Sequence, residues 1–76
     1  MKLNEMIPEL EEMLGFDAGT IKIDGNISDV PDWDSMAILT FIAFVEEKFD
    51  LVLDGDQIAG ATTFKELFNL LGDKVE

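Results

Sequence analysis

The stretch SMAILTFIAFVEEKF, residues 35–49, constrains the fold most strongly, because it is largely apolar and contains neither glycine nor proline. Nothing in it breaks a helix and charged residues return only at its end, so it predicts a helix from Ser35 to Phe49. At about 100° per residue, one face of this helix is apolar and is expected to face the core. The members of that face are Ile38, Phe41, Ile42, Val45 and Phe49.

The first segment of the chain predicts a second helix, because its apolar residues recur at intervals of three and four. These residues are Leu3, Met6, Ile7, Leu10, Met13 and Leu14. Pro8 lies inside the pattern, so we expect either a kink or a regular part that starts close to Pro8. Gly15 is expected to end the helix.

The last third of the chain predicts one short and one longer helix. Residues from Asp56 to Gly60 can form at most one or two helical turns. Thr63 and Glu66 have the spacing of a capping box, and Gly72 is expected to stop the helix that they open. The apolar positions of this helix are Phe64, Leu67, Phe68 and Leu71.

Residues 15–34 are rich in glycine, aspartate and proline and predict a long loop. Loops of this length in compact domains are usually functional or pinned by their own side chains. The candidates for pinning it are Phe16, Ile21, Ile23, Ile27, Val30 and Trp33. We therefore expect an all-α bundle with three main helices, a short third helix and a long loop between the first two, forming one domain over residues 1–76.

The charge of the chain restricts its partners. Seventeen acidic residues against five lysines give a net charge of −12. Nucleic acid and anionic membrane surfaces are therefore poor partners, whereas basic protein surfaces are attracted. The first residues lack the apolar core of a secretory signal, and no apolar run is long enough to span a membrane, so a cytoplasmic protein is expected. The charge opposes self-association, so a monomer is expected.

Ser35 is the hydroxyl whose position calls for an explanation, because it stands between an acidic loop and the most apolar helix. The chain has no histidine or cysteine, so a Ser-His nucleophile, a thiolate and the usual transition-metal ligands are excluded. The loop that starts at Asp24 lacks the glycine and the bidentate glutamate of an EF-hand, and we predict no metal site. Two interpretations of Ser35 stay open: a helix N-cap, or a serine that carries a covalent group.

The face of the 35–49 helix opposite its apolar stripe is expected to look outward. Its members are Met36, Thr40, Ala43 and Glu47, flanked by Leu39 and Glu46. Apolar residues beside a serine and surrounded by acids form a candidate docking surface, although isolated exposed apolar residues are also ordinary.

The motif DSM at residues 34–36, followed by AILTFIAFVEEKFD, resembles the acyl carrier protein signature, in which Asp-Ser-Leu opens an apolar second helix that ends in Glu-Glu and Phe-Asp. Length, acidity and the order of the four segments extend the resemblance over nearly the whole chain. It implies an acyl-carrier-like four-helix bundle that is no enzyme itself. It further implies that a phosphopantetheinyl transferase attaches 4'-phosphopantetheine to Ser35, next to Asp34.

By the same resemblance, acyl-transfer or synthase enzymes with basic patches would recognise the outward face named above. Five residues lie where the family can shelter an acyl chain between the second and third helices: Phe41, Ala43, Phe44, Ile58 and Ala59. The cargo would be an acyl or aminoacyl group in lipid, polyketide or related biosynthesis.

Several residues depart from the pattern of fatty-acid carriers. They are Asp32 where many carriers have glycine, Trp33 at a position that is usually small, Ala37 and Thr40 where acids are common, and Lys48 within the acidic cluster. These departures favour a specialised carrier, or one with little internal space and a short cargo. The alternative from another class is an acidic helical interaction domain that docks on a basic protein and carries no prosthetic group.

Overall fold

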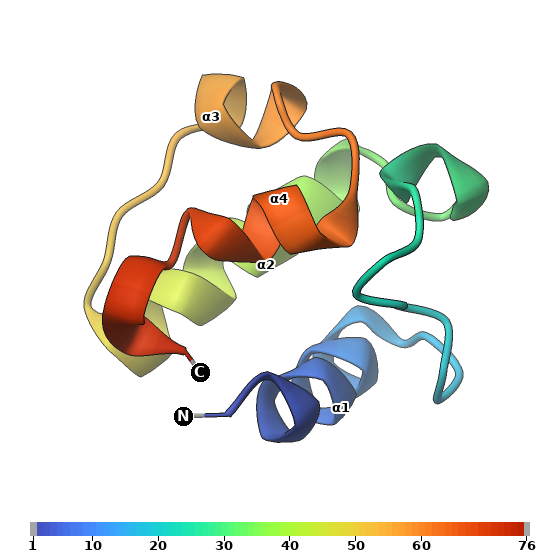
Figure 1. Ribbon diagram of the computed structural model, residues 1–76, viewed down its shortest axis with the longest axis horizontal. Helices are drawn as coiled ribbons and strands as arrows, with labels where there is room; N and C mark the ends of the chain where they lie inside the picture. The colour runs from blue at the N-terminus through green and yellow to red at the C-terminus, as the bar shows by residue number, and fades with distance from the viewer. Residues whose placement is uncertain (1, 76) are drawn as a thin grey trace.

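The computed structural model describes residues 2–75, which form four α-helices around a shared core (Figure 1). The elements are α1 (Leu3–Leu14), the 3-10 turn η1 (Ile27–Asp29), α2 (Ser35–Phe49), α3 (Gly55–Ala59), α4 (Phe64–Asn69) and the 3-10 turn η2 (Gly72–Lys74). No strand occurs in the described part of the chain, so the predicted all-α class, the long loop and the short third helix are confirmed. The more specific prediction of an acyl-carrier-like bundle stays a prediction.

Helix α1 begins at Leu3 and passes through Pro8 without ending there. The expectation that the regular part of the helix starts close to Pro8 is therefore wrong. Gly15 ends α1 as predicted: it adopts φ 77°, and its N–H donates to the Glu12 carbonyl oxygen at 3.2 Å. The N–H of Phe16 donates to the Glu11 carbonyl oxygen at 2.8 Å, which completes the closing turn.

Helix α2 has the predicted bounds, but its buried face is rotated relative to the expected one. The side chains buried most deeply on α2 are Ala37, Phe41, Phe44 and Val45, whereas Ile38, Ile42 and Phe49 are only partly buried against the core. The reason is that α1 packs against α2 and covers the Phe44 side. Periodicity defines a stripe along a helix but not the positions of the neighbouring helices.

The short helices α3 and α4 each have an N-cap residue whose side chain accepts a hydrogen bond from the first turn. Asp54 and Gln57 form a reciprocal capping box on α3, with hydrogen bonds of 2.9 and 3.1 Å. On α4 the Thr63 hydroxyl accepts from the Glu66 N–H at 3.1 Å, as predicted. The Glu66 carboxylate, however, accepts from the N–H of Thr62 rather than from that of Thr63, so the predicted capping box is only half formed.

The end of α4 lies earlier than predicted. The helix stops at Asn69, and Leu70 and Leu71 form a turn before η2. Gly72 adopts φ 60° at the start of η2, so this glycine reverses the chain after the helix instead of capping it directly.

The long loop is tied to the start of α4 by main-chain hydrogen bonds. The Ile27 N–H donates to the Thr62 carbonyl oxygen at 2.9 Å, and the Phe64 N–H donates to the Gly25 carbonyl oxygen at 3.1 Å. Of the six predicted pinning residues, five are buried or partly buried, but Ile23 is exposed. The pairing joins segments far apart in sequence, which local patterns do not reveal.

A buried carboxylate fixes the first half of this loop. Glu11 on α1 is only 3% exposed, and its Oε2 accepts a hydrogen bond of 2.9 Å from the N–H of Ile21. Sequence patterns did not single out Glu11, because an acid beside an apolar stripe is ordinarily solvated. The Glu11 carboxylate accepts the hydrogen bond that the Ile21 N–H would otherwise give to water, because the fold buries this N–H group.

We expect Glu11→Ala to lower the free energy of unfolding by about 1–3 kcal/mol, because it leaves the buried Ile21 N–H without an acceptor. Urea unfolding followed by circular dichroism measures the change. The exposed neighbour Glu12 provides the matched control, and Glu12→Ala should stay within about 0.5 kcal/mol of the parent chain. Equal effects of the two substitutions would contradict the role given to Glu11.

Four aromatic rings join the loop, α2 and α4. The ring of Trp33 meets those of Phe41 and Phe64 edge-on, with centroids 5.9 and 5.6 Å apart. Phe68 lies 6.2 Å from both phenylalanines. Trp33 therefore anchors the loop to the core two residues before Ser35.

Candidate functional site

Ser35 is the first residue of α2 and its side chain is exposed. Its hydroxyl makes no hydrogen bond to any of residues 2–75. An exposed hydroxyl without an internal partner is available to another molecule. Trp33 packs against Phe41 and Phe64 and so fixes the end of the loop that leads to Ser35. The serine therefore lies on an ordered part of the surface.

The N-cap of α2 is Asp34 and not Ser35. Asp34 has extended backbone geometry, and its Oδ1 accepts from the Ala37 N–H at 3.0 Å. Its carbonyl oxygen accepts from the Ile38 N–H, also at 3.0 Å. The interpretation of Ser35 as the helix cap is therefore wrong. Both residue types are good caps, and only the backbone geometry decides between adjacent ones.

We expect Asp34→Ala to lower the free energy of unfolding by about 0.5–2 kcal/mol, since it removes the cap of the longest helix. The control is Asp32→Ala, which removes an exposed carboxylate of the same loop that caps no helix. Thermal unfolding of the two variants distinguishes the cap from a general effect of charge. A larger loss for Asp32→Ala would show that the cap is misassigned.

Two main-chain donors remain beside Ser35. The N–H groups of Ser35 and Met36 have no acceptor among the described residues, because the Asp34 side chain serves only Ala37. Such donors, together with the helix dipole, favour an anionic oxygen at this end of α2. The carboxylates of Asp32 and Asp34 act against it, so an anionic group here has to extend toward solvent.

The outward face of α2 is exposed as predicted. Met36 is 70% and Leu39 60% exposed. Ala43, Glu46 and Glu47 are exposed as well, whereas Thr40 is partly buried and donates its hydroxyl to the Met36 carbonyl oxygen at 2.9 Å. Five of the six predicted partner-binding residues thus form an open surface that leads away from Ser35.

Two of the departures from fatty-acid carriers have structural consequences. Ala37 is only 5% exposed, so an acid at this position would not belong to the outward surface in this chain. The ammonium group of Lys48 pairs with the carboxylate of Glu9 on α1 at 3.0 Å. Lys48 therefore turns toward α1 and partly neutralises that side of the molecule.

The five residues expected to shelter an acyl chain divide into buried and exposed positions. Phe41, Phe44 and Ile58 are buried in the core, where their side chains pack against other residues. Ala43 and Ala59 are exposed. The space next to Phe41 is filled by the aromatic cluster to which Trp33 contributes.

A hollow of about 320 Å³ lies near Ser35, between the end of α1 and the start of α2. Its lining includes Met13 and Phe16 on one side and Asp34, Met36 and Thr40 on the other. Sequence patterns did not associate the end of α1 with the serine. The sequence feature that belongs to this hollow is Met13, the apolar residue near the end of the α1 stripe. The structure leaves its side chain half exposed.

Comparison with known proteins adds no family assignment: no family model matches the chain, and no curated protein or solved structure matches it significantly. Among residues 2–75, none of the helices is both long and apolar enough to cross a membrane.

Proposed function

We propose that the chain is an acyl carrier protein that holds an acyl or aminoacyl group as a thioester on a 4'-phosphopantetheine arm at Ser35. One observation carries the proposal: the Ser35 hydroxyl is exposed and has no structural partner, because Asp34 caps α2 in its place. An exposed serine at the start of a helix that has no capping role is well suited to modification.

The residues around Ser35 fit the prosthetic group. Its phosphate would be joined to Ser35 Oγ, near the unpaired N–H groups of Ser35 and Met36. The group would supply the thiol that a chain without cysteine lacks. Asp34 keeps the start of α2 in place through the bond from Ala37, and the carboxylates of Asp32 and Asp34 would repel the phosphate of a bound arm toward solvent.

The partners that this surface suits are proteins with basic patches. Met36 and Leu39 offer apolar contact, and Glu46 and Glu47 offer carboxylates on the same helix. The net charge of −12 would speed encounters with such partners. We propose a phosphopantetheinyl transferase and acyl-transfer or synthase enzymes of a specialised cytoplasmic pathway. The carrier itself catalyses nothing.

The filled interior favours a short or solvent-exposed cargo. The rings of Trp33 and Phe64 pack against each other and Trp33 also packs against Phe41, one of the residues expected to shelter an acyl chain. Making room for such a chain would separate close-packed rings, which is unfavourable in a small core.

The thioester can be tested by loading the chain from acetyl-coenzyme A with a broad-specificity phosphopantetheinyl transferase. We expect a mass gain of one acetylated arm, and neutral hydroxylamine should then remove the acetyl group but leave the arm. An acetyl group that resists hydroxylamine would contradict a thioester. Loading from palmitoyl-coenzyme A tests cargo length, and stabilisation of the fold by the long chain would contradict a filled interior.

The second candidate is an acidic docking domain without the arm, which the exposure of Met36 and Leu39 also suits. Ser35→Ala separates the two functions. A carrier loses acyl transfer with this substitution, whereas an arm-free domain keeps its partner and its activity in the cell.

A further inference from the structure

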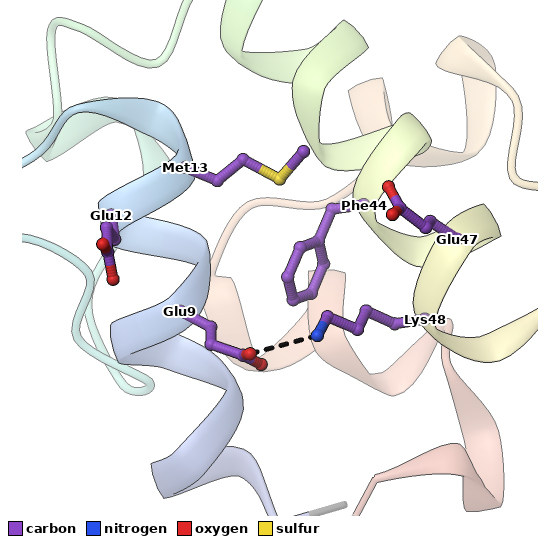
Figure 2. Close-up of a pocket in the computed structure, with 6 residues that line it drawn as sticks. All are labelled: Glu9, Glu12, Met13, Phe44, Glu47 and Lys48. Carbon is purple, nitrogen blue, oxygen red and sulfur yellow. Dashed lines mark hydrogen bonds and ion pairs between the residues drawn. The ribbon is translucent and has the colours of Figure 1, made fainter.

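A groove of about 330 Å³ runs between α1 and α2, at the edge of the predicted docking face (Figure 2). It is lined by Glu9, Glu12 and Met13 of α1 and by Phe44, Glu47 and Lys48 of α2. Figure 2 shows the side chains of Met13 and Phe44 pointing into the space between the helices. Apart from Glu47, none of these residues was predicted to contact a partner.

The apolar part of the groove is open to solvent on one side. Met13 is 50% exposed although it belongs to the apolar stripe of α1, whereas Phe44 is only 2% exposed and forms the base. Met13 also lines the hollow that borders Asp34 and Met36. The groove and that hollow therefore meet at Met13 and follow α2 toward Ser35.

The rim of the groove is acidic. Three carboxylates and one ammonium group surround it, which leaves a net charge of −2. The single ammonium, on Lys48, is already paired with Glu9 at 3.0 Å, with both side chains more than 40% exposed. The carboxylates of Glu12 on α1 and Glu47 on α2 form no ion pair with another residue of the described range 2–75.

We propose that this groove binds a basic amphipathic helix of a partner protein, which inserts one apolar side chain between Met13 and Phe44 and places lysine or arginine near Glu12 and Glu47. Helices commonly bind such grooves through a few apolar anchors, and methionine adapts its shape to them. The charge of the rim selects a basic helix over an acidic one. Ser35 and Glu47 are about 18 Å apart along α2, so a helix of about 12 residues covers the groove and the hollow.

This inference goes beyond the carrier function and does not depend on it, because no contact in the groove involves Ser35. The two are linked only by position: a helix in the groove would place the rest of the partner beside the serine. A basic helix that covers the Glu9–Lys48 ion pair competes with Lys48 for the carboxylate of Glu9 and is repelled by the ammonium group. Lys48 is therefore expected to weaken binding of the helix.

The test uses a synthetic helical peptide of about 14 residues, with one central leucine flanked by four lysines on an alanine and glutamine background. A second peptide has serine in place of the leucine and the same charge. Both are titrated into the full chain carrying ¹³C-methyl methionine, in parent and Ser35→Ala forms and at physiological salt. We expect the leucine peptide to shift the Met13 methyl signal, to bind more tightly than the serine peptide, and to do so equally in both forms.

Three substitutions locate the site. Met13→Ser should weaken binding of the leucine peptide about tenfold, the scale expected for losing most of one apolar contact. Val52→Ser, at a residue 74% exposed and outside the groove, should change nothing. Leu39→Ser, at a residue of the predicted docking face that lines neither the groove nor the hollow, is the control for that face.

Substitutions of two lysines test the electrostatic part of the proposal independently. Lys48→Gln should tighten binding about threefold because it frees Glu9, whereas Lys65→Gln on α4 makes the same change in net charge and should have a smaller effect. Equal binding of the two peptides, a larger loss with Leu39→Ser than with Met13→Ser, or equal effects of the two lysine substitutions would overturn the proposal. A failure here leaves acetyl loading at Ser35 unaffected, so the two proposals fail separately.

Discussion

Phe41→Ala is expected to lower the free energy of unfolding by about 3–5 kcal/mol, because it removes a fully buried ring from the centre of the core. Phe41 contacts Trp33 of the loop and Phe68 of α4, so its loss leaves a cavity where three segments meet. A chain of this length has a total stability of roughly 4 to 11 kcal/mol. The substitution should therefore remove a large part of the total stability.

The matched control is Leu39→Ala, which removes a large apolar side chain from the same helix at a position 60% exposed. It should change stability by less than about 0.5 kcal/mol. Urea unfolding followed by circular dichroism and by the fluorescence of Trp33 reports both variants. A loss of less than about 1 kcal/mol in Phe41→Ala would contradict the filled interior and with it the argument for a short cargo.

Ser35→Ala is expected to abolish attachment of phosphopantetheine while leaving the stability of the chain within about 0.5 kcal/mol of the parent. The serine hydroxyl makes no internal hydrogen bond and the cap is on Asp34, so the fold loses nothing with it. The contrast with Asp34→Ala, which should destabilise, separates the two adjacent residues. Thermal unfolding and intact mass, measured on the same samples, give both results.

A loss of stability in Ser35→Ala as large as that in Asp34→Ala would mean that the serine has a structural role after all. The other serine of the chain, Ser28 in η1, provides a control for reactivity, because it is also exposed. Ser28→Ala should accept the arm as the parent does.

The sequence was sufficient to predict α2 and the order of the helices. The stretch from Ser35 to Phe49 contains no helix breaker, and Gly15 and Thr63 mark helix ends by their own chemistry. The path of the long loop was not predictable, because it depends on Glu11 and on the pairing of Ile27 with Thr62. Both contacts join residues at least ten positions apart.

The candidate site was predicted in part. The exposure of Met36 and Leu39 followed from helical periodicity, whereas the choice of cap between Asp34 and Ser35 required the backbone geometry. The groove beside Phe44 was missed, because a stripe pattern assigns Met13 to the core without showing that α2 leaves it half uncovered.

The most direct test of the central claim is the intact mass of the chain after incubation with coenzyme A and a broad-specificity phosphopantetheinyl transferase. The account predicts a gain of one phosphopantetheine group in the parent and in Ser28→Ala, and no gain in Ser35→Ala. No gain in the parent, under conditions that fully modify a control carrier, would contradict it and would favour the arm-free docking domain.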